Sequence, residues 1–442
     1  MWSEAWWTFL HIWYASSRSS MLLVAAKFFP FALLLEFPLQ LLVFLGILRW
    51  GLRRRIGVNS PKGFFPRVSC LITCYSEGEE VKKTIRSLVE QDYAGTIEII
   101  PMVDGAIQNA ATLRAARQAQ RQLSGRADRQ IQVVPKWQRG GRVSSLNTGL
   151  AFAHGTVVMA LDGDTSFDND MVRRAVAHFV DFNVIGVAGN LRVRNGARSL
   201  ATRFQAMEYL LSISAGRTGL SEFNMVNNIS GAFGVFRASF LRHIGGWDTG
   251  TAEDLDLTLR MKQFFGRHPG LRIIFDPHVV GHTDVPESFT AFFRQRWRWD
   301  GDLYYLYIRK YGKNFRPSVL GWKNFLFTIY SGLIQQLLLP FIIVLYTIFL
   351  FVSYPPGPVL GILGFVYFIY FLVLSFLYGL YMLLVSERWK DDLSYAILLP
   401  FYPLFAFFVR VNSPLAILQE MLWKTHLESS MAPWWVLRKS KF

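Results

Sequence analysis

Two pairs of acidic residues mark where this chain could carry out chemistry. The stretch "LDGDT" places Asp162 and Asp164 on either side of a glycine, directly after the apolar run "VVMAL". Two carboxylates at the end of a buried strand are costly without a partner, which favours a functional role over a solvated acidic turn. Such a pair can hold one hard divalent cation, with the phosphates of a ligand filling the remaining octahedral positions. The pattern therefore predicts a site for a metal ion and a phosphorylated ligand.

The second pair opens a helix in "GTAEDLDLTLRMKQF". Glu253 and Asp254 lie in its first turn, where the helix dipole favours carboxylates, and Asp256 can belong to the same charge bias. An ionised carboxylate within hydrogen-bond reach of a hydroxyl can also act as a general base, a role that would suit Asp254. Upstream, "SGAFGVFRASFLRHIGGW" combines small and aromatic residues. It could form a wall against a flat ring, or a turn in the core.

Strands and helices alternate in the region that must position these acids. We predict strands over residues 67–77, 96–106, 130–137 and 156–164, separated by helices. Successive βα units of this length imply a parallel sheet with helices on both faces. Ligands of such sheets bind at the carboxyl ends of the strands. Acidic residues end three of these strands and should converge on one crevice: Glu77, Asp104, and the pair Asp162 and Asp164.

Only two cysteines are present, Cys70 and Cys74, on one face of the first predicted strand. Two cysteines exclude a disulfide framework, and we expect buried thiols rather than a metal-binding pair. The chain has no G-x-G-x-x-G or P-loop motif, which disfavours a dinucleotide site or a Walker-type NTPase.

The composition indicates a membrane protein. Of 442 residues, 52% are hydrophobic and 18% are charged, and the mean hydropathy is +0.24. A typical soluble protein has about a quarter of its residues charged. The apolar residues concentrate in 20–50 and 317–411, whereas 60–315 has ordinary composition. The net charge of +16 suits anionic lipid or an anionic substrate. We expect no nucleic acid partner, because no zinc-finger, homeodomain or RNA-recognition signature appears.

Several apolar stretches are long enough to cross a bilayer, which needs about 20 residues. Met21–Leu48 is one, and the arginines that follow it place that end in the cytoplasm. Ser331–Ser353 and Val359–Val385 are two more, whereas Leu393–Val409 either crosses or forms a re-entrant or interfacial segment. The tryptophan-rich residues 1–19 are expected in the bilayer interface, with a short span as the alternative, and a basic tail occupies 412–442.

The stretch "RQRWRWDGD", Arg294–Asp302, interleaves arginine and tryptophan. This composition suits a groove that stacks rings and binds phosphate, and it also suits the headgroup layer of a bilayer. Because aromatic sequence flanks it on both sides, we predict amphipathic interface helices over 286–316.

Taken in order, these motifs resemble the processive family 2 glycosyltransferases, namely the hyaluronan, chitin, cellulose and poly-N-acetylglucosamine synthases. The resemblance covers nearly the whole chain. It rests on an Asp after the second strand, D-x-D, E-D opening a helix, and Q-x-x-R-W just before membrane spans. It implies an α/β GT-A domain (the nucleotide-diphospho-sugar transferase fold) over 60–285, inserted between transmembrane α-helices. It also implies a multi-pass enzyme of the inner (plasma) membrane whose catalytic domain is cytoplasmic.

The resemblance assigns roles to single residues. Asp254 would be the catalytic base, with Glu253 beside it, and Asp164 would bind a Mg²⁺ or Mn²⁺ ion together with Asp162. Trp299 would contact the acceptor sugar. The residues expected to bind the nucleotide sugar, a UDP-sugar, are Asp104 at the uridine, Glu77, Asp162, Gln295, and Arg298 at the diphosphate.

Three positions depart from the family pattern. Val103 replaces the first of two aspartates, Arg142 in "GGRVSSLN" replaces a lysine, and Ala252 replaces the threonine of T-E-D. None of them removes a group assigned to catalysis, although they weaken any inference about the product.

The resemblance predicts that the enzyme elongates a β-linked polysaccharide and passes it through its own spans. Poly-β-N-acetylglucosamine is the expected product, with hyaluronan-like and β-glucan products open. Membrane lipids and a small accessory membrane subunit are possible partners. Two alternatives stay open: a non-processive synthase that adds a sugar to a membrane lipid, and a non-catalytic membrane scaffold with a GT-A fold.

Overall fold

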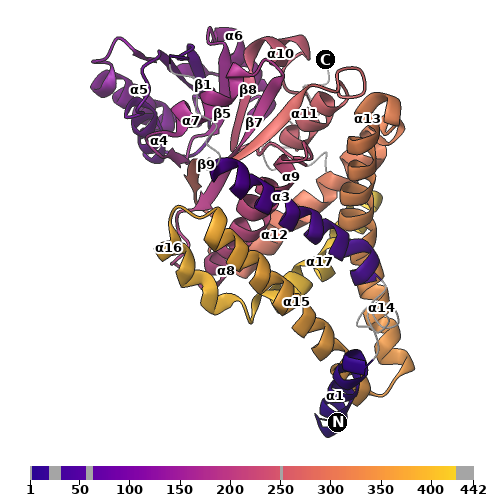
Figure 1. Ribbon diagram of the computed structural model, residues 1–442. Coiled ribbons are helices and arrows are strands. Elements are labelled where there is room, and N and C mark those ends of the chain that lie inside the picture. The colour runs from indigo at the N-terminus through magenta and orange to yellow at the C-terminus, as the bar shows by residue number, and fades with distance from the viewer. Residues whose placement is uncertain (1, 19–30, 56–62, 249–251, 425–442) are drawn as a thin grey trace.

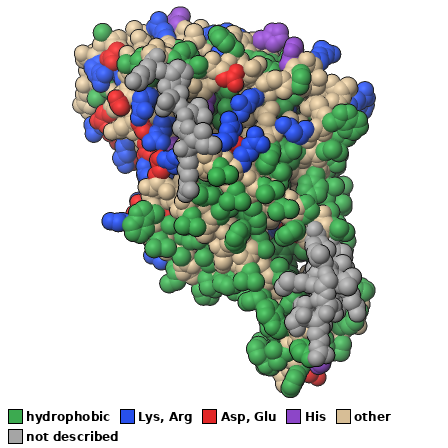
Figure 2. Space-filling view, viewed as in Figure 1, with side chains coloured by type: hydrophobic (Ala, Val, Ile, Leu, Met, Phe, Trp, Pro, Cys, Tyr) green, Lys and Arg blue, Asp and Glu red, His purple; other side chains and the backbone are tan. Residues whose placement is uncertain are grey.

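The computed structural model describes residues 2–18, 31–55, 63–248 and 252–424. An α/β domain occupies one end of the molecule, and long helices extend from it to the other end (Figure 1). Hydrophobic side chains cover the visible surface of the helical end, whereas most of the lysine, arginine, aspartate and glutamate side chains gather on the α/β domain (Figure 2). The two parts predicted from composition are therefore separate in space.

One nine-stranded sheet forms the centre of the α/β domain, in the order β3-β2-β1-β5-β8-β7-β9-β6, with β4 paired to β2. β1 pairs in parallel with β2 and with β5, as the βα pattern predicts. The predicted strand over 130–137 is two short strands, β3 and β4, which both pair with β2. The strands are β1 (Val68–Cys74), β2 (Ile97–Asp104), β3 (Arg129–Ile131), β4 (Val134–Lys136), β5 (Val157–Asp162), β6 (Ser166–Phe167), β7 (Val184–Val193), β8 (Phe233–Arg237) and β9 (Arg272–Thr283).

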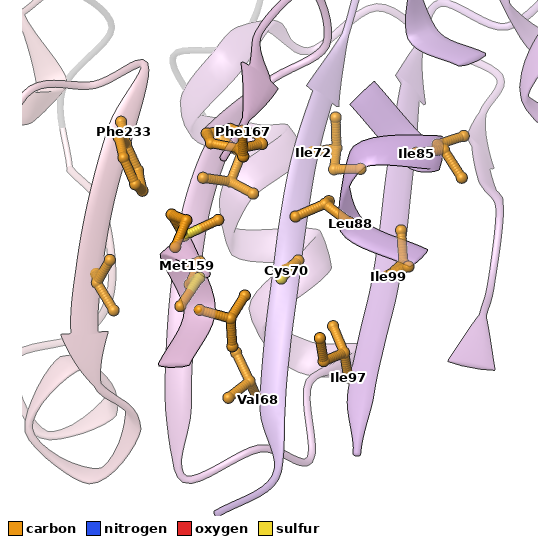
Figure 3. Packing of buried hydrophobic residues seen from close by; sticks show 14 of the residues in the cluster. Val68, Cys70, Ile72, Ile85, Leu88, Ile97, Ile99, Met159, Phe167 and Phe233 are labelled. Carbon is orange, nitrogen blue, oxygen red and sulfur yellow. The ribbon is translucent and has the colours of Figure 1, made fainter. Parts of the chain in front are cut away.

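The sheet continues beyond the four predicted strands, which all pair in parallel, and its second half is mixed. β8 is antiparallel to both β5 and β7. This strand lies within "SGAFGVFRASF", the stretch expected to be a wall or a turn. Phe233 on β8 is fully buried and packs edge-to-face against Phe167, with ring centroids 5.1 Å apart (Figure 3). Glycine and serine residues flank this short central strand, and such residues usually mark loops between strands. The sequence pattern therefore did not indicate a strand here.

Helices cover the sheet and bury their apolar faces. On α4, Val81, Ile85, Leu88 and Val89 are buried at helical spacing, as predicted, and Figure 3 shows Ile85 and Leu88 against β1 and β2. Cys70 and Cys74 are buried free thiols, which confirms the prediction. The helices of the domain are α4 (Glu80–Val89), α5 (Ala110–Leu123), α6 (Gly141–Phe152), α7 (Met171–Ala177), η2 (His178–Val180), α8 (Leu200–Glu208), η3 (Tyr209–Gly216), α9 (Arg217–Ser221), α10 (Ala238–His243) and α11 (Glu253–Lys262).

Three described helices are long and apolar enough to span a membrane: Leu34–Arg54, Pro317–Ser353 and Pro356–Leu384. The first continues past the predicted end at Leu48, because terminal arginines can extend toward the headgroups without ending a helix; residues 21–30 of that prediction lie outside the described residues. The helical part comprises α1 (Trp2–Arg18), η1 (Ala32–Glu36), α3 (Phe37–Arg55), α12 (Phe289–Tyr304), η4 (Tyr305–Lys310), η5 (Gly312–Asn314), α13 (Pro317–Phe327), η6 (Thr328–Leu338), α14 (Leu339–Ser353), α15 (Pro356–Leu384), α16 (Trp389–Leu393), η7 (Ser394–Leu398) and α17 (Tyr402–Trp423).

The C-terminal apolar stretch is a bent pair of helices, Trp389–Leu398 and Tyr402–Trp423, which meet at 74°. At the bend, the Tyr367 hydroxyl in the middle of α15 donates to the carbonyl of Pro400 at 2.6 Å. The two outer ends contact the α/β domain and η4: Arg192 of β7 pairs with Asp392, and Arg309 of η4 donates to the carbonyl of Met421. Both outer ends therefore lie on the side of the α/β domain.

The N-terminal helix α1 packs along α15 at the end away from the α/β domain (Figure 1). Gly357 and Gly361 lie against α1, and a methyl group built on Gly361 would meet the Ala5 carbonyl at 2.6 Å. Glycine at these positions therefore allows the close approach of the two helices.

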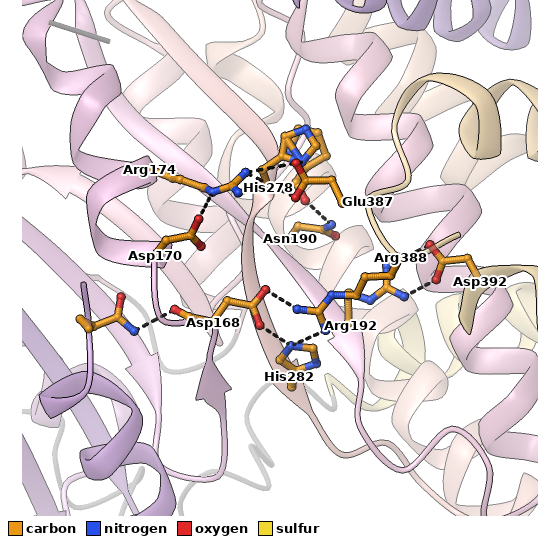
Figure 4. A network of polar contacts seen from close by, with 12 residues as sticks. Asp168, Asp170, Arg174, Asn190, Arg192, His278, His282, Glu387, Arg388 and Asp392 are labelled. Carbon is orange, nitrogen blue, oxygen red and sulfur yellow. Dashed lines mark hydrogen bonds and ion pairs between the residues drawn. The ribbon is translucent and has the colours of Figure 1, made fainter. Parts of the chain in front are cut away.

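A polar network joins the α/β domain to the loop that follows α15 (Figure 4). Arg388 of that loop pairs with Asp168 at 2.5 Å, and Asp168 also contacts His282 at 2.9 Å. A cavity of about 700 Å³ opens beside it, but none of the predicted site residues lines this cavity. Its arginines Arg174 and Arg388 already pair with carboxylates of the same network. The network therefore fastens the domain to the helical part.

Candidate active site

The guanidinium of Arg142 lies at the centre of the predicted site. It forms an ion pair with Asp162 at the end of β5, and its Nε lies 2.5 Å from Glu253 Oε1 at the start of α11. It also donates to Thr73 Oγ1 at 2.8 Å and to the Gly231 carbonyl at 2.5 Å. Burial tends to lower the pKa of Arg142, but Asp162 and Glu253 outweigh it and hold that pKa above its usual value. The Arg142 side chain therefore links the ends of β1 and β5 and the residues just before β8 to the start of α11.

Asp254 is held in a fixed orientation beside this pair. Its Oδ2 accepts hydrogen bonds from Asn228 Nδ2 at 3.0 Å and from the Gly231 backbone amide at 2.9 Å. A methyl group at Gly231 would lie 2.9 Å from Glu253 Oε1, so a glycine is needed for this close approach. A carboxylate held in this way could act as a general base.

Glu77 approaches the D-x-D turn from the end of β1. A methyl group at Gly163 would lie 3.0 Å from the Thr73 carbonyl and 3.2 Å from Glu77 Cδ, so a larger residue there would have to displace one of these groups by a few tenths of an ångström. Glu77 Oε2 is shielded from solvent, and no described residue donates a hydrogen bond to it. Burial, assisted by Asp164 and Asp162, raises the pKa of Glu77 to about 7.

This cluster of carboxylates fits a cation. Glu77 Oε2 is a buried carboxylate oxygen without a described donor, and Asp164 lies beside it. Burial and the neighbouring Asp162 raise the pKa of Asp164. A positive charge would stabilise both carboxylates. In the described part of the chain, no three histidine, cysteine, aspartate or glutamate side chains are arranged to hold a metal ion by themselves. Since Asp162 is engaged by Arg142, the cation would also need oxygen atoms from a ligand, as Mg²⁺ usually does.

Asp104 is 4% exposed, and both of its carboxylate oxygens are occupied. Oδ1 accepts from Lys136 Nζ and from the Gly140 amide at 2.9 Å, and Oδ2 accepts from the Gly141 amide at 2.9 Å. These bonds fix the turn that opens α6, the helix on which Arg142 lies. On the outer side of that turn, the guanidinium of Arg139 lies 3.9 Å from the ring centre of Tyr75.

The Q-x-x-R-W motif lies on α12, which the sequence places at the interface. Gln295 and Arg298 are half-buried, and Trp299 is 36% exposed. Arg296 lies 4.6 Å over the Trp299 ring and pairs with Glu208 of α8 at 2.6 Å. Arg296 therefore packs the motif against the α/β domain.

Hydrogen bonds connect helix α11 to the segment that follows α12. Asp256 is completely buried and accepts hydrogen bonds from Lys310 Nζ and from the Tyr311 hydroxyl, both at 2.6 Å. Arg260 donates to its second oxygen at 2.9 Å. The prediction of a plain N-terminal charge bias is therefore incomplete for Asp256, because its partners come from η4 and the residue that follows it.

Two residues with left-handed backbone flank the site. Ser76 after β1 has φ 71°, and Ala252 before α11 has φ 45°. Such conformations cost about 1–2 kcal/mol in residues other than glycine, and they concentrate at functional sites. The E-D helix therefore starts from a strained residue.

The structure brings Asp162, Glu253 and Asp254 into one cluster, with Glu77 and Asp164 on its other side. Sequence reasoning noted Arg142 only as a departure from a family pattern, and it missed Asn228 and Gly231 altogether. The signal that could have identified Arg142 is its place after "QRGG", at the start of a helix that follows a strand end.

Comparisons with known proteins agree with this geometry. A model of glycosyltransferase-like family 2 matches residues 66–301, which is more than half of the chain. The chain is 27% identical over 288 residues to a poly-beta-1,6-N-acetyl-D-glucosamine synthase of Staphylococcus epidermidis, and the match covers 65% of each chain. A synthase of the same name from Staphylococcus aureus is 28% identical over 254 residues, which are 57% of this chain and 58% of that one.

The chain thus spans about 65% of the length of the first of these relatives. Among solved structures, a mannosyltransferase from Pyrobaculum calidifontis, in complex with GDP-Man and Mn²⁺, aligns with a TM-score of 0.47 at 17% identity; the alignment covers 87% of this chain and 99% of that one. The family match extends from just before β1 into α12. It includes every predicted site residue, from Glu77 to Trp299. The chain therefore belongs to glycosyltransferase family 2, and its α/β domain is a GT-A domain.

Proposed function

We propose that this protein is an inverting membrane glycosyltransferase that uses a UDP-sugar to elongate a β-linked polysaccharide. Poly-β-N-acetylglucosamine is the proposed product, because the curated relatives above are named as synthases of that polymer. The observation that carries the proposal is Arg142, which pairs with both Asp162 of D-x-D and Glu253 of E-D. A donor site and a base are thereby held next to each other.

On the donor side, Asp164 would hold a Mg²⁺ or Mn²⁺ ion together with the donor's phosphates, with Asp162 and Glu77 nearby. The ion would neutralise charge on the diphosphate. Arg298 would add a guanidinium to the same group, because an arginine fork matches phosphate geometry. Gln295 would also contact the nucleotide sugar. Asp104 fixes the turn before Arg142. Asp104 and this turn would contact the uridine and so complete the proposed donor site.

On the acceptor side, Asp254 would take the proton of the attacking hydroxyl. The hydroxyl oxygen would form a bond to the anomeric carbon as the bond from that carbon to the diphosphate breaks, and the UDP would leave with the bonding electrons. Attack opposite the leaving group inverts an α-linked donor into a β-linked product. Trp299 offers an aromatic face on which the acceptor sugar can stack.

The cytoplasm is the proposed location of the α/β domain, since arginines follow the first span and the re-entrant pair returns to that side. Polar groups among the helices support a path for a hydroxyl-rich chain: Glu36 pairs with Arg410, and the Tyr330 hydroxyl donates to the Leu35 carbonyl at 2.6 Å. Polar groups within membrane helices are costly and usually mark a pathway. Membrane lipids are proposed as neighbours, and a small accessory membrane subunit as a partner.

Incubation of the purified protein with UDP-N-acetylglucosamine and either Mg²⁺ or Mn²⁺ tests the proposal. We expect UDP release and a polymer that a β-N-acetylglucosaminidase digests, and both should be lost in Asp254→Asn. Short glycolipids as the product would favour the lipid-modifying alternative. Unchanged cellular function in Asp254→Asn would favour the scaffold.

A further inference from the structure

The two carboxylate oxygens of Asp254 are unequally occupied. Oδ2 accepts hydrogen bonds from Asn228 Nδ2 at 3.0 Å and from the Gly231 amide at 2.9 Å. Oδ1 accepts from the Leu255 amide at 2.7 Å. An ionised carboxylate offers about four lone-pair sites, two on each oxygen. Both sites of Oδ2 are therefore filled by described donors, whereas one site of Oδ1 is not.

The side-chain amide of Asn228 is held by Thr258, one turn further along α11. Thr258 is completely buried. Its hydroxyl accepts from the Ile229 amide at 3.0 Å, and its one hydrogen faces Asn228 Oδ1 at 3.2 Å and the Asp254 carbonyl at 2.8 Å. An ionised Asp254 can only accept hydrogen bonds, so Asn228 must turn its nitrogen toward Asp254 and its oxygen toward Thr258.

These bonds join two segments that are far apart in the sequence. Asn228 and Gly231 precede β8, whereas Asp254 and Thr258 belong to α11. The Gly231 carbonyl also accepts from Arg142 at 2.5 Å, which fixes the first segment to the centre of the site. Asp254 itself is only half-buried, so its side chain is not sealed in the core. The carboxylate is thus held on one side and open to a ligand on another.

We propose that Oδ1 of Asp254 is the atom that takes the proton of the acceptor hydroxyl, and that Asn228 and Thr258 are positioning residues that keep Oδ2 occupied. The inference rests on the proposed function, because it needs a hydroxyl acceptor at Asp254. The hydroxyl O–H bond breaks, and its hydrogen passes as a proton to the free lone pair of Oδ1. The electrons left on the oxygen form the bond to the anomeric carbon, and the diphosphate leaves with the electrons of the bond that breaks.

The first test is Asn228→Ala, in which Oδ2 keeps only the Gly231 donor and the carboxylate is free to rotate. The full chain in lipid nanodiscs is supplied with UDP-N-acetylglucosamine and a β-1,6-linked N-acetylglucosamine pentasaccharide. Loss of one hydrogen bond to a charged group corresponds to a fall of about 10–150-fold in kcat. Both KM values should stay within about twofold of wild type, because Asn228 acts on the base and not on the substrates. Asn228→Asp should lose at least as much, because an ionised carboxylate cannot donate and repels Asp254.

The second test is the pair Thr258→Val and Thr258→Ser. Thr258→Val releases the Asn228 amide and should lower kcat by about 2–12-fold, as for loss of a neutral hydrogen bond. Thr258→Ser keeps the hydroxyl and should restore kcat. The matched control is Thr148→Val on α6, since the Thr148 hydroxyl donates to the carbonyl of Ser144, four residues earlier, at the same 2.8 Å. It removes an equivalent bond within a helix and should leave kcat unchanged.

Three results would overturn the inference. A wild-type kcat in Asn228→Ala would show that the base needs no second donor on Oδ2. A raised KM with unchanged kcat would make Asn228 a substrate contact instead. Equal losses in Thr258→Val, Thr258→Ser and Thr148→Val would indicate a general effect of substitution in these helices.

Crystal structures of wild type and Asn228→Ala separate this inference from the proposed function. If wild type releases no UDP from UDP-N-acetylglucosamine, the proposed function fails. In that case, a rotated Asp254 carboxylate in Asn228→Ala would still support Asn228 as its positioning residue. A carboxylate with the same orientation in both structures would refute that role.

Discussion

Replacement of Arg142 is the most direct test of the site, because this one side chain connects its two halves. In the wild type, the guanidinium spans from Asp162 on β5 to Glu253 on α11 and also contacts Thr73 and Gly231. Arg142→Ala removes the cation and leaves two carboxylates facing each other. Arg142→Lys keeps the charge, but a single ammonium has neither the width nor the fixed fork that reaches both carboxylates.

The size of the effect follows from the burial of the partners. Removing one partner of a buried ion pair costs about 3–5 kcal/mol, because the other charge is left uncompensated. The Glu253 side chain is only 9% exposed, whereas that of Asp162 is 30% exposed and partly screened by water. We therefore expect the lower end, about 3 kcal/mol, for Arg142→Ala. In a domain of this size that is a fall of about 6–12 °C in Tm. Arg142→Lys should lose one charge-assisted hydrogen bond, which corresponds to a fall of about 10–150-fold in kcat/KM.

Thermal unfolding and UDP release with UDP-N-acetylglucosamine measure the two effects. The double variant Arg142→Ala/Glu253→Gln is the control, because it removes both the cation and its most buried partner. Its Tm should lie above that of Arg142→Ala, while its activity stays lost. The reasoning would be refuted if Arg142→Ala unfolds at the wild-type temperature, or if Glu253→Gln gives no recovery in its background.

Two further predictions follow from contacts around the site. Arg298→Ala should abolish UDP release, because it removes the guanidinium proposed for the diphosphate. Arg296→Ala should reduce UDP release less, because Arg296 contacts Trp299 and Glu208. Equal losses of UDP release in the two variants would contradict this division of roles. Lys262 is 2% exposed, and burial lowers its pKa to about 7. The unfolded chain then binds more protons between about pH 7 and pH 10.5, so stability rises with pH in that window. Lys262→Met should therefore stabilise the protein by up to about 4 kcal/mol at pH 7, and the difference in Tm from wild type should shrink by pH 10; a constant difference would argue against a buried neutral lysine.

The first half of the catalytic domain could be predicted from the sequence because its pattern is local. Each of β1, β2 and β5 is a run of buried apolar residues that ends in polar ones, and the intervening helices show a helical spacing of apolar residues. In parallel strands the polar ends meet at one edge. That rule predicts that Glu77, Asp104, Asp162 and Asp164 lie at one edge of the sheet.

The second half could not be predicted in the same way, because its strands pair across long sequence distances. β8 joins β5 and β7 in antiparallel fashion although about 70 residues separate it from β5. No local turn marks such a pairing. The roles of Asn228 and Gly231 depend on that pairing, since they precede β8 and meet Asp254 only when α11 packs beside it.

The contacts of α11 also bear on how sugar transfer could be linked to movement of the polymer. Asp254, the proposed base, lies in the first turn of the helix, and two residues later Asp256 accepts hydrogen bonds from Lys310 and Tyr311, just beyond α12. Trp297 of α12 in turn donates a hydrogen bond to Gln419 of α17. Charged or buried hydrogen bonds cost about 1–3 kcal/mol each when left unmade. A displacement of α12 that broke the Asp256 contacts would therefore cost several kcal/mol of free energy. A displacement in which α11 moved together with α12 would keep these contacts and avoid that cost. These hydrogen bonds thus favour joint movement of α11 and α12, so that the proposed base Asp254 would keep its position relative to the proposed acceptor platform Trp299.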